Sequence, residues 1–347
     1  MSEESEIPTA HPKITKRNLF TPHIIALVIM WFLSTVSFVV MLLNGVRNND
    51  QFRVMRDIIQ VAYVLALFWY LIKTGPSVKQ LPDLNPVFLP KLRISKLIPV
   101  IGITLLFIAE FFGQGLLLPL LMLATIWILI AWRRDISLPA VLLGLGLTTI
   151  AFLAGLPFYQ NQYLEKVNFI VLLVFVTPMF VVGGLLGKRS GLVGSQLYTR
   201  RYREGVKNFL CGCVLFIPLG LANAASGAPD PGMTWVTHWW IPFSQPWFSG
   251  IVEEAWFRLF LVSLCYWLLQ PAFNKRPSIS VIYAVLFSGI TFGLGHGGTL
   301  LDRFVMIGLL FGLPMAIVFI KRDWEHAVGA HYIINMIPTL MVFLETI

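Results

Sequence analysis

The chain is a series of long apolar segments separated by short breaks that are polar or contain Pro and Gly. A helix that crosses a membrane needs about 20 mostly apolar residues, and eleven segments approach or exceed this length. The pattern therefore predicts an all-α, polytopic transmembrane helix bundle with about 11 spanning helices. The predicted spans are 23–44, 54–72, 97–113, 115–132, 137–158, 168–187, 207–225, 247–270, 279–296, 304–320 and 325–346.

Composition supports the membrane interpretation. Hydrophobic residues make up 57% of the chain and charged residues only 12%, with a mean hydropathy of +0.76. These values exclude an ordinary soluble domain. Residues 1–20 are an exception, because they are largely polar and contain Pro8 and Pro12. We expect them to form a disordered cytoplasmic tail rather than a cleaved signal peptide.

Lysine and arginine are concentrated in alternate connections, above all in 73–96 and 188–207. Because cytoplasmic loops carry an excess of these residues, their placement predicts a cytoplasmic N-terminus. Basic loops beside anionic lipid also account for the net charge of +9, so the charge requires no nucleic-acid partner. We expect an integral membrane protein of a prokaryotic plasma membrane.

The polar residues that interrupt apolar segments gather towards the C-terminus. This predicts a transmembrane part of unknown role at 21–205, with about six helices, and a functional core at 206–347, with about five. The tryptophan-rich loop 226–246 comes just before the first acidic residues of this core. Its tryptophans suggest either an interfacial belt or a lid over a site.

Two carboxylates and a guanidinium lie in one apolar segment of the core, as Glu253, Glu254 and Arg258. An Asp, Arg or Lys at the centre of a membrane helix costs roughly 2.5–3.5 kcal/mol, so such residues are kept when they are paired or functional. Arg258 follows Glu254 by four residues, which is the spacing of a helical ion pair. Adjacent residues on a helix diverge by about 100°, so Glu253 points elsewhere and is the freer carboxylate, available as a base.

Two further pairs with the same spacing follow, Phe292 with His296 and His331 with Asn335. An imidazole and an amide that project side by side can both donate hydrogen bonds to a developing oxyanion. The Phe292 ring can line a substrate cavity and shield His296 from water. Counting about 1.5 Å per residue from the predicted helix ends places His331 roughly 9–12 Å away in depth from Glu253 and His296.

The three motifs read EExxxR from Glu253, FxxxH from Phe292 and HxxxN from His331. In this order they resemble the CAAX protease and bacteriocin-processing (CPBP, Abi) family of intramembrane endopeptidases. The resemblance covers about 206–347, which it makes the catalytic core. It implies that Glu253 and His296 activate a water, that His331 and Asn335 stabilise the oxyanion, and that Glu254 and Arg258 hold the helix and its charge.

The cofactor expectation is either none or zinc. The family has been described both as metal-dependent and as glutamate-based, and Glu253 or Glu254 with His296 and His331 would supply enough ligands for a catalytic zinc. The chain contains no HExxH helix, which favours the metal-free mechanism.

The leading hypothesis is therefore a peptidase, a hydrolase resembling CAAX prenyl endopeptidases. One alternative is a membrane peptide-binding or immunity protein of the same fold, without catalysis. Another is a proton-coupled transporter that uses Glu253 and Glu254 as carriers. The expected partners are a peptide or protein tail as substrate, the lipid bilayer, and a membrane partner at the N-terminal helices.

Overall fold

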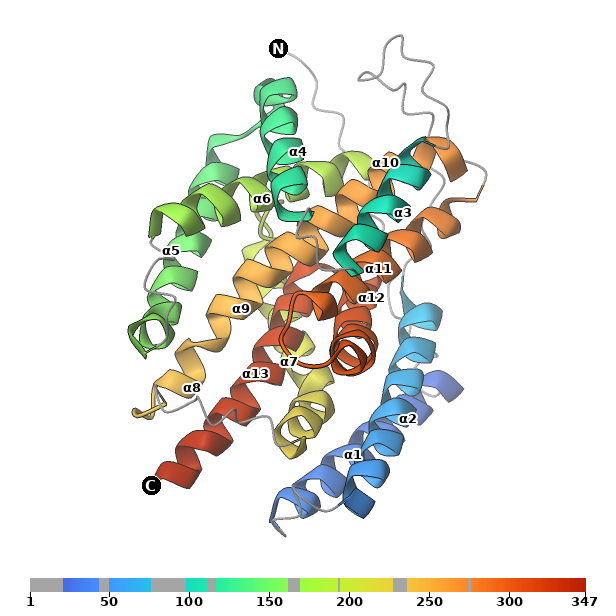
Figure 1. The fold of residues 1–347 in the computed structure, drawn as a ribbon, viewed down its shortest axis with the longest axis vertical. Helices are drawn as coiled ribbons and strands as arrows, with labels where there is room; N and C mark the ends of the chain where they lie inside the picture. Colours follow the sequence, from blue (N-terminus) through green and yellow to red (C-terminus); the bar gives the residue numbers. More distant parts are fainter. Residues whose placement is uncertain are drawn as a thin grey trace.

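The computed structural model describes residues 21–43, 50–75, 98–111, 117–161, 169–192, 194–226, 236–273 and 276–347, and this part of the chain is almost entirely helical. The N-terminal helices are α1 (Pro22–Leu43), α2 (Asp50–Thr74), α3 (Ile98–Phe111), α4 (Leu117–Ala131), a short 3₁₀ turn η3 (Arg133–Asp135), α5 (Leu138–Asn161) and α6 (Phe169–Ser190). The C-terminal helices are α7 (Tyr202–Ala225), α8 (Ile241–Ser244), α9 (Pro246–Glu253), η5 (Glu254–Val262), α10 (Ser263–Phe273), α11 (Pro277–Leu294), η6 (Asp302–Gly312), α12 (Leu313–Lys321) and α13 (Trp324–Thr346). Figure 1 shows them packed as one bundle, with α1 and α2 paired along one side next to α7.

The predicted all-α transmembrane bundle is confirmed, but the number of spans differs. Within the described residues, eight helices are long and apolar enough to cross a membrane, against about eleven predicted. The described parts of α3 and α4 have only 14 and 15 residues, shorter than the length a span needs. The predicted span 247–270 is helical throughout, because α9, η5 and α10 follow one another without a break.

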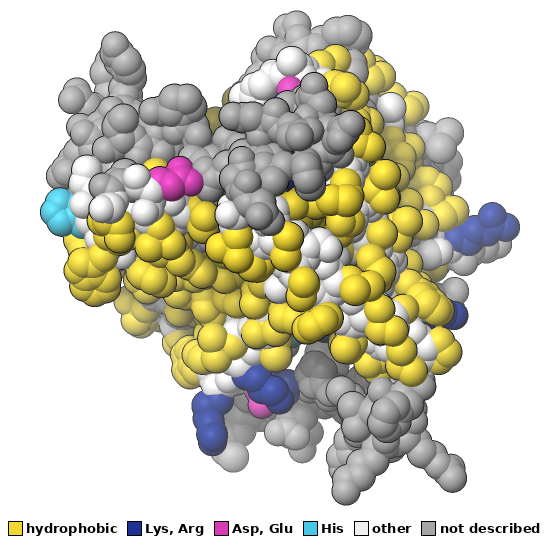
Figure 2. All heavy atoms as spheres, turned by 90° about the horizontal axis from the view of Figure 1, so that it is seen from below, with side chains coloured by type: hydrophobic (Ala, Val, Ile, Leu, Met, Phe, Trp, Pro, Cys, Tyr) yellow, Lys and Arg dark blue, Asp and Glu magenta, His cyan; other side chains and the backbone are white. Residues whose placement is uncertain are grey.

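Apolar side chains cover much of the outer surface, as expected for a protein whose solvent is lipid. Figure 2 shows hydrophobic side chains spread over most of the described part of one face. Helix α1 contributes many of them, for example Val28 and Phe32, each 60% exposed. This helix is lipid-facing along most of its length.

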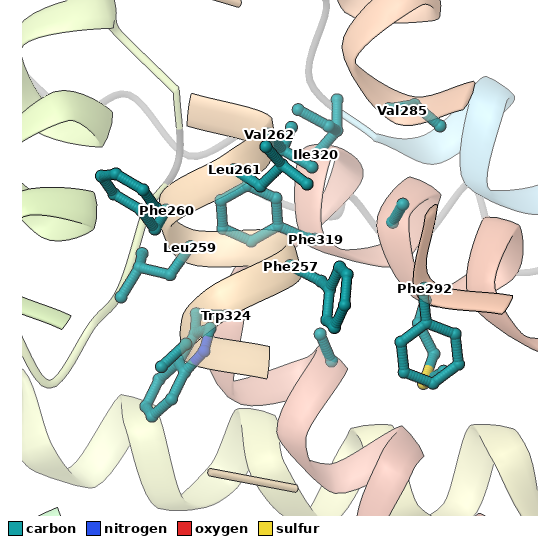
Figure 3. Packing of buried hydrophobic residues seen from close by; sticks show 14 of the residues in the cluster. Phe257, Leu259, Phe260, Leu261, Val262, Val285, Phe292, Phe319, Ile320 and Trp324 are labelled. Carbon is teal, nitrogen blue, oxygen red and sulfur yellow. The ribbon is translucent and has the colours of Figure 1, made fainter. Parts of the chain in front are cut away.

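The core is centred on η5, which is a π-helix with i→i+5 hydrogen bonds. Its residues Leu259 and Phe260 are fully buried and lie near Phe319 of α12 and Trp324 of α13 (Figure 3). A π segment changes the direction in which the following side chains project, and such segments are frequent at functional sites. Here it begins at Glu254, the second carboxylate of the acidic pair.

Helices α7 and α13 pack closely against each other, because glycines remove side chains at their contact. A Cβ atom on Gly212 would lie 2.2 Å from the carbonyl oxygen of His326, and one on Gly329 would lie 2.0 Å from that of Phe209. Small residues at these positions let the two backbones touch, which is the usual means of packing membrane helices. The backbone of α7 therefore fixes the position of α13, which carries His331 and Asn335.

Two prolines interrupt these helices, and neighbouring helices satisfy the carbonyls that they free. Pro218 of α7 cannot donate to the carbonyl of Val214, which instead accepts a 2.9 Å hydrogen bond from Trp31 Nε1 of α1. The next carbonyl, that of Leu215, accepts one from Tyr63 Oη of α2. The α1–α2 pair is thus attached to α7 at its proline interruption.

Pro338 of α13 frees the carbonyl of Ile334 in the same way. Asn223 Nδ2 of α7 donates to this carbonyl over 3.1 Å. Because Ile334 directly precedes Asn335, this contact fixes the backbone of α13 at the third motif. At each proline, a polar side chain from a neighbouring helix therefore donates a hydrogen bond to the carbonyl that lacks its backbone donor.

Replacing Asn223 with Leu is expected to lower the free energy of unfolding by about 1 kcal/mol, since the Ile334 carbonyl loses its donor. In a Pro338→Ala background the same replacement should cost less, because alanine, unlike proline, can supply the missing backbone N–H. Unfolding of the purified variants in detergent measures both effects. An equal loss in the two backgrounds would contradict the assignment of Asn223 as the substitute donor.

The start of α13 is anchored by two buried carboxylates. Asp323 caps the helix and accepts from the backbone N–H of His326 over 3.0 Å. Glu325 accepts hydrogen bonds from Ser195 Oγ at 2.5 Å, from the Gln196 N–H at 3.0 Å and from the Leu197 N–H at 2.9 Å. These bonds tie the connection between α6 and α7 to the N-terminal end of α13.

Candidate active site

Residues from three parts of the chain meet where α9 becomes η5. Glu253 ends α9 and Glu254 begins η5, while His296 directly follows the C-cap of α11 and His331 lies on the second turn of α13. The structure brings all four side chains within hydrogen-bonding or ion-pair distance of at least one other.

His331 lies between the two glutamates, one at each ring nitrogen. Its Nδ1 is 2.7 Å from Glu254 Oε1, and its Nε2 is 3.8 Å from Glu253 Oε2. A carboxylate accepts, so Nδ1 must carry the proton of the short bond. The ring is therefore held in one orientation, with Nε2 directed at Glu253.

His296 presents the same nitrogen to Glu253. Its Nδ1 lies 2.7 Å from the carbonyl oxygen of Phe292, to which it must donate, and its Nε2 is 3.8 Å from Glu253 Oε2. Glu253 Oε2 is itself buried and has no hydrogen-bond partner among the described residues. The carboxylate oxygen thus faces the Nε2 atoms of two imidazoles at distances too long for a direct hydrogen bond.

Accessibility separates the two imidazoles. The His296 side chain is 36% exposed and that of Glu253 is 26% exposed, whereas the His331 side chain is only 4% exposed. A substrate can therefore reach the side of the site formed by Glu253 and His296. His331 lies behind them.

A fully buried ion pair between Glu254 and Arg258 holds the carboxylate that binds His331. Arg258 Nε is 3.2 Å from Glu254 Oε2, as the four-residue spacing predicts, and both side chains are 0% exposed. Arg258 Nη2 also donates to the carbonyl of Gly312 at 3.2 Å. Glu254 thus has the Arg258 guanidinium beside one oxygen as an ion-pair partner, whereas its other oxygen accepts the hydrogen bond from His331.

The Phe292 ring fills the space between these groups. Its centroid is 4.6 Å from that of His296 and 5.7 Å from that of His331, and the Arg258 guanidinium carbon lies 4.2 Å above it. The ring is 3% exposed. Phe292 is therefore packed within the site, and it separates the buried ion pair from His296.

Asn335 is directed at a residue that the sequence analysis missed. Its Nδ2 donates to Ser249 Oγ over 2.7 Å, and no hydrogen bond between Asn335 and His331 is found in the described residues. Ser249 lies four residues before Glu253, on the same face of α9. This spacing is the signal in the sequence that identifies Ser249, although a single serine in an apolar helix is usually a packing residue.

The predicted depth difference between His331 and the other two side chains is wrong. A depth counted along the helices holds only if the segments carrying the motifs start at the membrane surfaces. In the structure α13 continues past the start of α9, and α8 packs against the extra length. Tyr332 Oη donates to the Phe243 carbonyl over 2.9 Å, and Val236 and Ile241 pack against Val342 and Phe343.

The described part of the tryptophan-rich loop includes Trp239 and Trp240, which are 69% and 40% exposed. Trp235 lies outside the described residues. Exposed indole rings beside α8 agree with either the belt or the lid interpretation, and both stay predictions.

The predicted zinc ligands lie near one another, but their separations differ from those of a zinc site. Each histidine has its Nδ1 occupied and its Nε2 directed inwards, which is a chemistry suited to zinc. However, no group of three His, Cys, Asp or Glu side chains in the described residues is arranged to hold a metal ion. Two ligands on a tetrahedral zinc with bonds of about 2.0–2.1 Å lie roughly 3.3 Å apart, whereas Glu253 Oε2 is 3.8 Å from each Nε2. In this arrangement the three atoms lie further apart than the ligands of one zinc ion.

The residues of the candidate active site lie in a segment that matches a known protein family. The segment 235–337 matches the family model described as type II CAAX prenyl endopeptidase Rce1-like. This segment contains every residue of the three motifs, from Glu253 to Asn335. No match was found among curated proteins or among solved structures. The helices that carry the candidate active site are therefore similar to those of the type II CAAX prenyl endopeptidases, over residues 235–337, which are less than a third of the chain.

Proposed function

We propose that the protein is an intramembrane endopeptidase that hydrolyses a peptide bond in a peptide or protein tail, using a water activated by Glu253. The observation that carries the proposal is the position of Glu253 Oε2, which is unpaired and faces the Nε2 atoms of both histidines. Polar groups separated by more than 3.5 Å are commonly bridged by a water, and here such a water would contact a base. The family match supports this class of reaction.

In the proposed reaction Glu253 accepts a proton from the water while the water oxygen attacks the carbonyl carbon of the scissile bond. His296 orients the water, because its Nε2 has a free lone pair when Nδ1 donates to Phe292. The tetrahedral intermediate then collapses with cleavage of the C–N bond. Glu253 returns its proton to the departing amine.

The negative oxygen of the intermediate requires donors, and His331 and Asn335 are proposed to supply them. Glu253 and Glu254 carry two negative charges and Arg258 one positive charge, so the set becomes neutral when His331 is an imidazolium. Its Nδ1–H is bonded to Glu254, leaving an Nε2–H to stabilise the oxyanion. Asn335 uses one amide hydrogen for Ser249 and retains a second.

A quenched-peptide library incubated with the purified protein tests the proposal. Cleavage by the wild type and its loss in His296→Ala are expected. The same assay with a chelator separates the two mechanisms: resistance supports a glutamate base alone, whereas loss that zinc restores would assign a metal to this site. If the wild type cleaves no peptide above the His296→Ala background, the endopeptidase proposal fails in favour of a binding protein.

The N-terminal helices are proposed to support this site rather than to form a second one. The support passes from α1 and α2 to α7 through Trp31 and Tyr63, and from α7 to α13 through Asn223. The exposed apolar face of α1 remains available to lipid or to a membrane partner.

A further inference from the structure

Ser249 is a buried serine of α9 to which the proposed reaction gives no role of its own. Its side chain is only 5% exposed. Ser249 Oγ accepts a hydrogen bond from Asn335 Nδ2 over 2.7 Å and donates one to the Pro246 carbonyl over 3.4 Å. Because the single hydroxyl hydrogen is directed at Pro246, the oxygen can meet Asn335 only as an acceptor. The amide of Asn335 must therefore turn its Nδ2, and not its Oδ1, towards α9.

The two helices that carry this bond are in close contact beside it. A Cβ atom on Gly250 would lie 3.5 Å from the Val328 carbonyl oxygen and 3.8 Å from the Tyr332 nitrogen, so α9 runs along the backbone of α13 next to Ser249. Ser249 also precedes Glu253 by four residues on the same helix, about 6 Å of helical rise. The bond to Ser249 thus fixes the Asn335 amide relative to the proposed base.

The second hydrogen of the Asn335 amide is left without a partner. Nδ2 carries two hydrogens, and its bond to Ser249 is its only hydrogen bond within the described part of the chain. The backbone beneath it is also held, because Thr339 Oγ1 donates to the Asn335 carbonyl over 2.8 Å. With the backbone and one amide hydrogen fixed, the planar amide leaves one direction for the other. Asn335 is half-buried, so a substrate can reach this hydrogen.

We propose that Ser249 is a positioning residue, which orients the Asn335 amide so that its second N–H meets the negative oxygen of the tetrahedral intermediate. This inference rests on the proposed endopeptidase function and deepens it. A donor that is oriented before the substrate binds needs no reorganisation during the reaction. Without the hydroxyl, the amide can rotate about its terminal torsion and present Oδ1, an acceptor that repels the developing negative charge.

Ser249→Ala tests the proposal in the quenched-peptide assay. We expect kcat to fall about 10–100-fold while KM stays close to the wild-type value, because the oriented donor acts on the intermediate and not on the bound substrate. The matched control is Ser190→Ala in α6. Ser190 is 1% exposed, and its Oγ donates to the Gly187 carbonyl, three residues before it, over 3.3 Å, as Ser249 does to Pro246. This control should leave kcat and KM unchanged.

A pair of variants with equal shape separates the hydroxyl from the packing of α9 on α13. Ser249→Thr keeps a hydroxyl on the β-carbon, whereas Ser249→Val replaces it with a methyl group and has the same size and branching. Any disturbance from the extra methyl group is therefore common to both. The threonine variant should have a kcat about 10–100-fold above that of the valine variant. Equal kcat values in this pair would refute the role of the hydroxyl.

The Asn335→Ala background shows whether Ser249 acts through Asn335. Asn335→Ala alone should lower kcat by about 10²–10³-fold, and adding Ser249→Ala should have no further effect. A further loss in the double variant, as large as that of Ser249→Ala in the wild type, would overturn the proposal and make Ser249 a packing residue. Either contrary result leaves Glu253-dependent cleavage by the wild type intact. No cleavage by the wild type would instead refute the proposed function itself.

Discussion

Glu253→Gln is expected to lower kcat for peptide cleavage by about 10²–10⁴-fold while leaving KM close to the wild-type value. Glutamine keeps the size of the side chain and can still contact the water, but it cannot accept a proton from it. The fold should persist, because Glu253 is the partly exposed member of the acidic pair and forms no ion pair with Arg258. Rates measured with the purified protein and one cleaved peptide give both constants.

The matched control is Glu204→Gln, an identical change at an exposed carboxylate in the first turn of α7. It should leave both constants unchanged. If Glu253→Gln retains more than about a tenth of the wild-type kcat, Glu253 is not the base. The two histidines would then become the candidates for that role.

Arg258→Met is expected to have the largest effect on stability, lowering the free energy of unfolding by about 3–5 kcal/mol. Methionine replaces the volume of the side chain but leaves Glu254 as a fully buried carboxylate with His331 as its remaining partner. It also removes the donor to the Gly312 carbonyl and the cation above the Phe292 ring. Thermal and denaturant unfolding in detergent measure the loss.

A double-mutant cycle distinguishes this electrostatic cause from a packing defect. Adding Glu254→Gln to Arg258→Met removes the unpaired charge, so the double variant should be more stable than Arg258→Met alone. Both variants are expected to be poor catalysts, because Glu254 holds His331 in place. If the two losses simply add, the ion pair contributes nothing beyond the packing of each side chain.

The sequence was sufficient for features that depend on one helix. Apolar segments predicted an all-α membrane bundle, and the four-residue spacing of Glu254 and Arg258 predicted their ion pair, because both depend on helical periodicity alone. The count of spans agreed less well, because the described parts of α3 and α4 have only 14 and 15 residues.

Contacts between helices could not be predicted in the same way. The bond from His331 to Glu254 depends on how far α13 extends past α9, which is set by the packing of α8 and by glycines such as Gly329. The spacing of His331 and Asn335 suggested two adjacent donors, but the structure directs Asn335 to Ser249 on another helix. Residue spacing identifies side chains on one helical face and leaves the facing helix unspecified.

The proline contacts also have a consequence for biosynthesis. The chain is made from its N-terminus, so Trp31 leaves the ribosome before the carbonyl of Val214, and Asn223 before that of Ile334. Each helix with an unsatisfied carbonyl therefore enters the bilayer when its donor is already there. An unpaired carbonyl in lipid costs several kcal/mol, so this order spares α7 and α13 that cost during insertion. Moving α1 and α2 to the C-terminus by circular permutation should consequently slow assembly, even though the finished protein would contain the same contacts.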